Sequence, residues 1–133
     1  MRFDTGHGQH TASISGQVIK SKLTGAFNSE GCSAWVHSVK SLIESLEGKP
    51  FCLLIDTRDY KGGTDEALSI ANDFNGWIND QRMVAKAHVI TSQLLHDIAI
   101  ERVPKIKHQN VQTFKNIEDA MTWLTEQLEQ AEQ

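Results

Sequence analysis

Polar and charged side chains gather directly after the most apolar segment of the chain, and their types could bind a ligand or transfer protons. The run 51–56 is too short for a helix and almost wholly apolar, which predicts a strand covered on both faces. A loop is predicted to follow over 57–63. Because open α/β sheets bind ligands beyond the carboxyl ends of their strands, this loop is the first candidate site. Its members are Asp56, Arg58, Asp59, Tyr60 and Lys61.

A second interpretation of the same residues needs no ligand. An Asp–Arg ion pair in a solvated turn, with Gly62 and Gly63 supplying unusual backbone angles, explains them as well. Sheet position alone is an argument by analogy and does not choose between the two interpretations.

Thr64 follows this segment and is the natural N-cap of the next helix. Asp65 and Glu66 stand in the first turn, where the helix dipole favours anions. A phosphate on Thr64 would lie beside those two carboxylates, so repulsion opposes modification and the plain N-cap is favoured. The spacing and the lysine of a P-loop are missing, and so is a glycine-rich dinucleotide motif after an early strand. No cofactor is therefore predicted.

The sequence gives little support for a nucleophilic cysteine or for a metal site. Cys52, His88 and Asp56 form a Cys–His–Asp arrangement on paper, but a thiol in an apolar strand lacks the cationic neighbour or helix N-terminus that would activate it. Both cysteines are expected to be buried thiols, and no catalytic residue is assigned. Among the six histidines only His7 and His10 are near neighbours. Zinc needs more ligands than these, so surface histidines are favoured and no metal site is predicted.

The three tryptophans could be core residues or could mark a binding surface. Trp35 begins the apolar stripe of a predicted first helix, which favours the core. The sharper alternative is a groove for a lipid-like ligand, or the face of a homodimer. Its lining would be Phe74, Trp77, Met83 and Trp123.

Alternating strands and helices must position these residues. Strands are predicted within 11–27 (one or two), at 51–56, at 85–90 and at 111–114. Helices are predicted after caps at Asn28, Thr64 and Asn116, with a shorter one over 93–102 that Pro104 ends or closely follows. This order predicts an α/β fold with a mixed, mostly parallel sheet of about four or five strands, an antiparallel edge or hairpin at the start, and about four helices.

Length, composition and charge narrow the function classes. The 133 residues suit a single domain over 1–133, large enough to bury a core without disulfides. The net charge is -4 and no stretch concentrates Lys and Arg, so nucleic acid is not an expected partner. No window is apolar enough for a membrane span and the first residues lack a secretory apolar segment, which predicts a cytoplasmic protein.

Several segments together carry a family resemblance. They are 23–28 leading into the first helix, 53–56 ending the central strand, 85–90, and 111–114 with 117–124. On these segments the chain resembles the SpoIIAA-like branch of the STAS superfamily, which is also compared with Sec14-type lipid-binding domains. The resemblance implies a mixed sheet and the binding of a partner protein or an apolar ligand. Classical anti-sigma-factor antagonists of that superfamily carry a phosphorylatable serine in an Asp-Ser-Ser-Gly motif, which is absent here, and Thr64 is the nearest counterpart.

Three functions follow as hypotheses. The first is a non-enzymatic STAS-like binding module with a regulatory role, whose partner is a protein or a hydrophobic small molecule. The second is a carrier or sensor of a lipid-like molecule held between helices and sheet. The third is a small enzyme that uses the loop after Asp56, although no catalytic constellation is visible.

Overall fold

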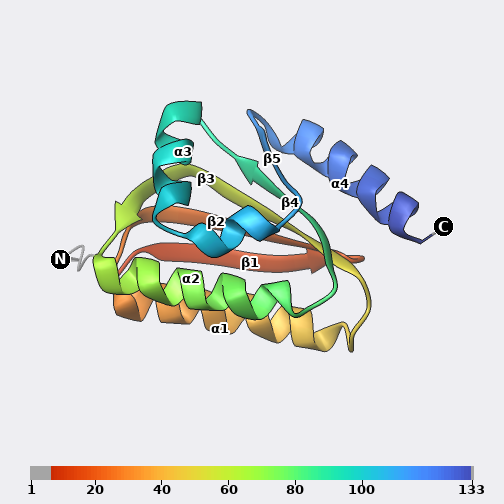
Figure 1. Cartoon of the computed structure of the whole chain (residues 1–133), viewed down its shortest axis with the longest axis horizontal. Helices are drawn as coiled ribbons and strands as arrows, with labels where there is room; N and C mark the ends of the chain where they lie inside the picture. Colours follow the sequence, from red (N-terminus) through yellow and green to blue (C-terminus); the bar gives the residue numbers. More distant parts are fainter. Residues whose placement is uncertain (1–6, 133) are drawn as a thin grey trace.

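The strands lie side by side in the order of the sequence, β1-β2-β3-β4-β5 (Figure 1). The structure is a computed structural model that describes residues 7–132. Its strands are β1 (Gln9–Ser15), β2 (Val18–Phe27), β3 (Phe51–Gly63), β4 (Met83–Val89) and β5 (Val111–Phe114). Its helices are α1 (Ser29–Ser45), α2 (Asp65–Asn79), α3 (Gln93–Glu101) and α4 (Ile117–Ala131), with a short 3-10 helix η1 (Pro104–His108). β1 and β2 are antiparallel and the other pairs are parallel, which confirms the predicted α/β fold with a mixed, mostly parallel sheet.

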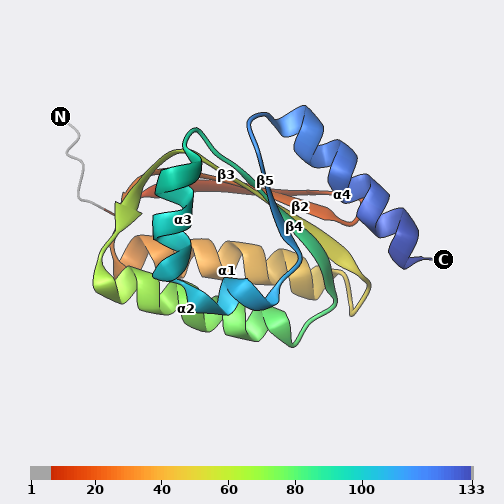
Figure 2. The same cartoon turned by 45° about the horizontal axis from the view of Figure 1, so that its top comes forward.

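The direction of the connections decides which face each helix covers. The crossovers β2-α1-β3, β3-α2-β4 and β4-α3-η1-β5 all advance the same way across the sheet. Because parallel crossovers are right-handed, α1, α2 and α3 with η1 fall on one face. The opposite face is left to α4, and Figure 2 shows α4 well apart from the adjacent helices α1 and α2.

Each face of the sheet has its own apolar core. The larger one joins the sheet to α1 and α2, and the buried stripe of α1 repeats at helical spacing through Cys32, Trp35, Val39 and Ile43. The smaller one joins β3 and β4 to α4. Side chains alternate along a strand, so Leu53 and Ile55 belong to the larger core while Cys52 and Leu54 belong to the smaller one. The Phe51–Ile55 segment is thus buried on both faces, as predicted.

The predicted loop over 57–63 is wrong, because β3 continues to Gly63. The polar residues of this segment pair with the end of β2, where Thr24 faces Asp59 and Gly25 faces Tyr60. Composition could not show this, since a strand extension stabilised by backbone pairing needs no apolar side chains. Gly62, with φ 102°, takes up the left-handed backbone that ends the strand.

Thr64 is the N-cap of α2, as predicted. Its hydroxyl oxygen accepts a hydrogen bond from the Ala67 amide at 3.1 Å, and Asp65 and Glu66 occupy the first turn. Asn28 and Asn116 cap α1 and α4 in the same way. The remaining boundary prediction also holds, because α3 ends at Glu101 and Pro104 opens η1.

Replacing Thr64 with alanine is expected to lower the free energy of unfolding by about 1 kcal/mol, because the Ala67 amide loses its acceptor. Urea unfolding followed by circular dichroism measures the change. Thr64→Ser keeps an acceptor oxygen and is the matched control. Equal stability of Thr64→Ala and the parent chain would contradict a capping role.

Candidate functional site

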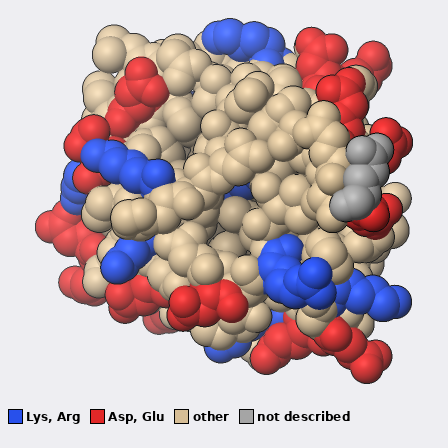
Figure 3. Space-filling view, turned by 45° about the vertical axis from the view of Figure 1, so that its right-hand side comes forward, with Lys and Arg blue, Asp and Glu red and all other residues tan. Residues whose placement is uncertain are grey.

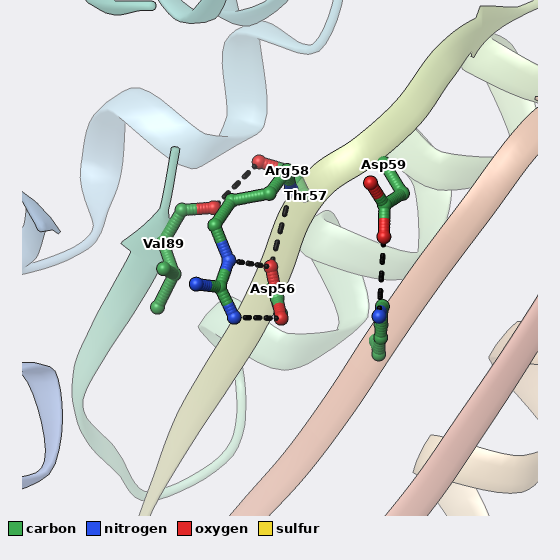
Figure 4. Close-up of polar contacts among 6 residues, drawn as sticks. Asp56, Thr57, Arg58, Asp59 and Val89 are labelled. Carbon is green, nitrogen blue, oxygen red and sulfur yellow. Dashed lines mark hydrogen bonds and ion pairs between the residues drawn. The ribbon is translucent and has the colours of Figure 1, made fainter. Parts of the chain in front are cut away.

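The residues that the sequence analysis grouped after Asp56 do not converge on one point. Asp56 is almost fully buried and forms a bidentate pair with Arg58, with Nε–Oδ1 at 2.9 Å and Nη2–Oδ2 at 2.8 Å (Figure 4). The Arg58 amide also donates to the same carboxylate. These hydrogen bonds hold the pKa of Asp56 below its ordinary value. The Asp–Arg pair of the alternative interpretation is thus present, but it lies in a strand with a buried carboxylate and not in a solvated turn.

A β-bulge separates Tyr60 from its neighbours. Lys22 pairs with Asp56 and Thr24 with Asp59, so β3 holds one more residue than β2 over this stretch. The extra residue reverses the alternation and turns Tyr60 toward the face of Ile55 and Thr57. Asp59 instead forms an ion pair with Lys22 at 3.1 Å, and both side chains are about half exposed.

The four residues proposed to line one groove lie on opposite faces of the sheet. Phe74 is buried in the larger core, where Trp77 stacks on it at 5.9 Å between ring centroids, and Met83 packs nearby. Trp123 belongs to the smaller core and contacts Phe114. A groove lined by all four is therefore wrong, since the sheet stands between Trp77 and Trp123.

The arrangement of Cys52, His88 and Asp56 is not formed either. Cys52 lies in the smaller core under α4, while His88 points to the other face of the sheet. Burial raises the pKa of the Cys52 thiol to about 11, so it stays protonated. Cys32 is likewise buried, with its pKa raised to about 11, and its thiol donates to the Ala67 carbonyl. Both cysteines are buried thiols, as predicted.

A cavity of about 170 Å³ lies on the face covered by α1, α2, α3 and η1. The sheet forms its floor through Ile55, Thr57 and His88, and apolar side chains of the helices form most of its wall. Figure 3 shows a face of the molecule with a hollow near its centre, where blue atoms of a Lys or Arg are visible at the bottom, while the other Lys, Arg, Asp and Glu lie mostly around the margin. The cavity is the candidate functional site because ligand sites are concave and largely apolar, with a few placed polar groups.

Lys86 supplies the most unusual polar group of this cavity. It is only 2% exposed, and its Nζ donates to Asn75 Oδ1 at 2.7 Å and, at 3.4 Å, to Gln109 Oε1. The Gln109 side chain in turn donates to Asn75 Oδ1. Within residues 7–132 no carboxylate pairs with the ammonium group. Burial without a counter-ion lowers the pKa of Lys86 to about 7.

Two histidines stand beside Lys86. His88 Nδ1 and His96 Nε2 are 2.5 Å apart, so one ring donates its proton to the other. His96 Nδ1 is buried and has no hydrogen-bond partner in the described part of the chain. Burial lowers the pKa of both rings, well below the ordinary value for His88, and the nearby Lys86 charge adds to this. The pair is therefore neutral near pH 7.

The titratable groups that line the cavity include bases and no carboxylic acid. Lys86, His88 and His96 are basic, and no Asp or Glu is among the lining residues. Tyr60 adds a hydroxyl whose pKa burial raises, so it is neutral as well. A cavity of this composition attracts a negatively charged or hydrogen-bond-accepting group.

Helix α3 is the wall of the cavity with the fewest buried side chains. It contains no buried residue, and Leu94 and Ile98 are 69% and 56% exposed. Its contribution to the cavity comes through Leu95, His96, Ala99 and Ile100. An element with few buried contacts opens at low free-energy cost, so among the walls of the cavity α3 is expected to open most readily.

Sequence reasoning missed the polar centre of this site. Lys86, Asn75 and His96 were not singled out, and His88 was expected at the surface or in a nucleophilic arrangement, whereas it is 6% exposed. One signal was available: Lys86 and His88 alternate with alanines in a segment predicted to be a strand, which places both on one face. Tyr60 is the one member of the predicted loop site that lines the cavity.

The fold and the site define a mixed α/β domain with an internal, mostly apolar cavity whose charged side chain is a buried lysine. No protein-family model matches the chain, and no curated protein matches it. Within residues 7–132 no three His, Cys, Asp or Glu side chains group so as to hold a metal ion. None of the described helices is both long and apolar enough to cross a membrane.

Proposed function

We propose that the chain is a non-enzymatic binding module that holds a small, largely apolar molecule between its sheet and its helices. The observation that carries this proposal is the cavity of about 170 Å³ against β3 and β4, with its apolar wall and its few convergent polar groups. An engineered cavity of about 150 Å³ holds a benzene molecule. The ligand is accordingly of that size, and a two-chain lipid is too large.

Catalysis has less support than binding. Asp56 is neutralised by Arg58, and both cysteine thiols are protonated. The third hypothesis, an enzyme built on the segment after Asp56, therefore lacks a free carboxylate or a thiolate at the site.

We also propose that the chain belongs to the SpoIIAA-like branch of the STAS superfamily. The resembling segments support this assignment, and a mixed sheet with crossover helices is compatible with it. A cytoplasmic location and a regulatory role are further parts of the same proposal, and the binding cavity supports the regulatory role.

Filling the cavity is expected to abolish binding. In Ala99→Phe, the larger side chain on α3 occupies space inside the cavity, so the affinity for the neutral probe hexanamide falls at least about tenfold. Chemical-shift changes of backbone amides in an NMR titration measure the affinity and locate the probe. Native mass spectrometry of the gently purified chain shows in parallel whether a small molecule is retained.

Ile98→Phe is the matched control, because Ile98 lies on the same helix and is 56% exposed. It should bind hexanamide as the parent chain does. Equal affinity of Ala99→Phe and Ile98→Phe, or the absence of any shift at cavity residues, would refute the proposal.

A partner protein or a second copy of this chain is the other candidate, and the exposed face of α3 favours it. Leu94, Leu95 and Ile98 are all more than half exposed on this helix. Apolar side chains grouped in this way often mark an interaction surface. The same native mass spectra report the oligomeric state, and a monomer at all concentrations would argue against the homodimer.

A further inference from the structure

We infer that the molecule held in this cavity is a small amphipathic anion, whose carboxylate lies against Lys86 and whose hydrocarbon part fills the apolar space. This inference rests on the proposed function and specifies its ligand. It follows from the placement, bonding and surroundings of the buried lysine.

Lys86 has unused capacity to bind an anion. An ammonium group carries three donors. The short bond to Asn75 Oδ1 uses one of them, and the contact to Gln109 Oε1 is long at 3.4 Å. Both partners are neutral amides, which orient the ammonium without neutralising it. A carboxylate oxygen would form a shorter, charge-assisted hydrogen bond and supply the missing counter-charge.

The polar groups that line the cavity beside Lys86 include hydrogen-bond donors and no carboxylate. The neutral pair of His88 on β4 and His96 on α3 has one ring N–H besides the one shared between the rings, so the pair can donate one hydrogen bond, and Tyr60 on β3 can donate another. Cys32 on α1 is a protonated thiol. From α2 the only polar side chain in the cavity wall is Asn75, a neutral amide. Lys107 on η1 is paired with Glu101, and the Asp97 carboxylate on α3 lies 3.8 Å from His96 Nδ1, with a 65% exposed side chain that is not part of the cavity wall.

The pH dependence of binding separates Lys86 from the histidines. The pKa of Lys86 is about 7, whereas burial lowers the pKa values of His88 and His96 from their ordinary value, so both rings are neutral above pH 7. A carboxylic acid is ionised above about pH 5. Between pH 7 and pH 8.5 Lys86 passes from about half protonated to almost wholly neutral, so anion affinity should fall about tenfold over this interval.

The experiment compares two probes of the same length, hexanoate and hexanamide, by NMR titration at constant ionic strength. At pH 6 the chain should bind hexanoate at least about tenfold more tightly than hexanamide, because only the former makes a charge-assisted bond to Lys86. In Lys86→Met the preference should vanish, with hexanamide affinity kept within about threefold. Lys61→Met is the matched control, since Lys61 is exposed, and it should retain the preference.

The outcomes separate the anion inference from the proposed binding function. Equal affinities for the two probes in the parent chain would overturn the inference and leave the proposed function in place, because hexanamide still binds. A preference for hexanoate that persists in Lys86→Met would overturn the role of Lys86. Binding of neither probe would overturn both the inference and the proposed function.

Discussion

Replacing Lys86 with methionine is expected to raise the free energy of unfolding at pH 7 by about 3 kcal/mol. Burial lowers the pKa of Lys86 from 10.5 to about 7, and each pKa unit corresponds to about 1.4 kcal/mol. Burying the amine therefore costs on the order of 4 to 5 kcal/mol of stability at neutral pH. Methionine removes that cost, while the lost hydrogen bonds to Asn75 and Gln109 offset about 1 kcal/mol of the gain.

The pH profile provides the sharper measurement. Because the folded pKa lies below the unfolded one, the unfolded chain binds the extra proton between pH 7 and pH 10.5. The stability of the parent chain should therefore rise with pH in this interval, by at most about 1.4 kcal/mol per pH unit. Lys86→Met should remove this slope, and Lys61→Met should keep it. Urea unfolding at pH 7 and pH 9 measures both. A destabilised Lys86→Met at pH 7 would mean that the protein already compensates the buried charge.

These two expectations about Lys86 connect stability with binding. A buried cation without a counter-ion destabilises the empty protein. A bound carboxylate would supply the counter-ion, so ligand binding is expected to stabilise the fold most where Lys86 is protonated. Because Lys86→Met is expected to fold at least as well as the parent chain, loss of hexanoate binding in this variant cannot be ascribed to unfolding.

The sequence was sufficient to predict the fold because its local signals agree with one another. Asn28, Thr64 and Asn116 cap the helices that their positions predicted. The apolar run ending at Ile55 forms the strand buried on both faces. Capping residues and hydrophobic periodicity are local properties, so they can be recognised without knowing the tertiary structure.

The site could be predicted only in small part, since it depends on contacts between distant segments. The β-bulge that turns Tyr60 into the cavity arises from the register of β3 against β2, which no local pattern encodes. The partners of Lys86 come from α2 and from the residue after η1. Trp77 and Trp123 looked alike in the sequence, and only the direction of the crossovers places them on opposite faces. Lysine in a strand is ordinarily exposed, so its burial had to be observed.

Replacing Arg58 with methionine is expected to lower the free energy of unfolding at pH 7 by about 2 to 3 kcal/mol. The Asp56 side chain is 5% exposed and would lose the bidentate guanidinium that satisfies it. Removing one member of a buried ion pair leaves an uncompensated charge, which costs about 3 to 5 kcal/mol when both members are buried. The expected value is smaller because Arg58 is 36% exposed.

The pH dependence and two control variants test the cause of this loss. In the parent chain the pKa of Asp56 is lowered, so the stabilisation by the pair is present above about pH 4 and is lost as the pH falls through the folded pKa. In Arg58→Met the carboxyl protonates more readily, and the difference between the two chains should shrink toward pH 3.

Lys22→Met breaks the exposed pair with Asp59 and should cost less than about 1 kcal/mol. The double variant Asp56→Leu with Arg58→Met should recover most of the lost stability, because no charge remains buried. If Arg58→Met instead left stability unchanged and weakened hexanoate binding, Arg58 would be a ligand residue and the segment after Asp56 would regain its place as the functional site.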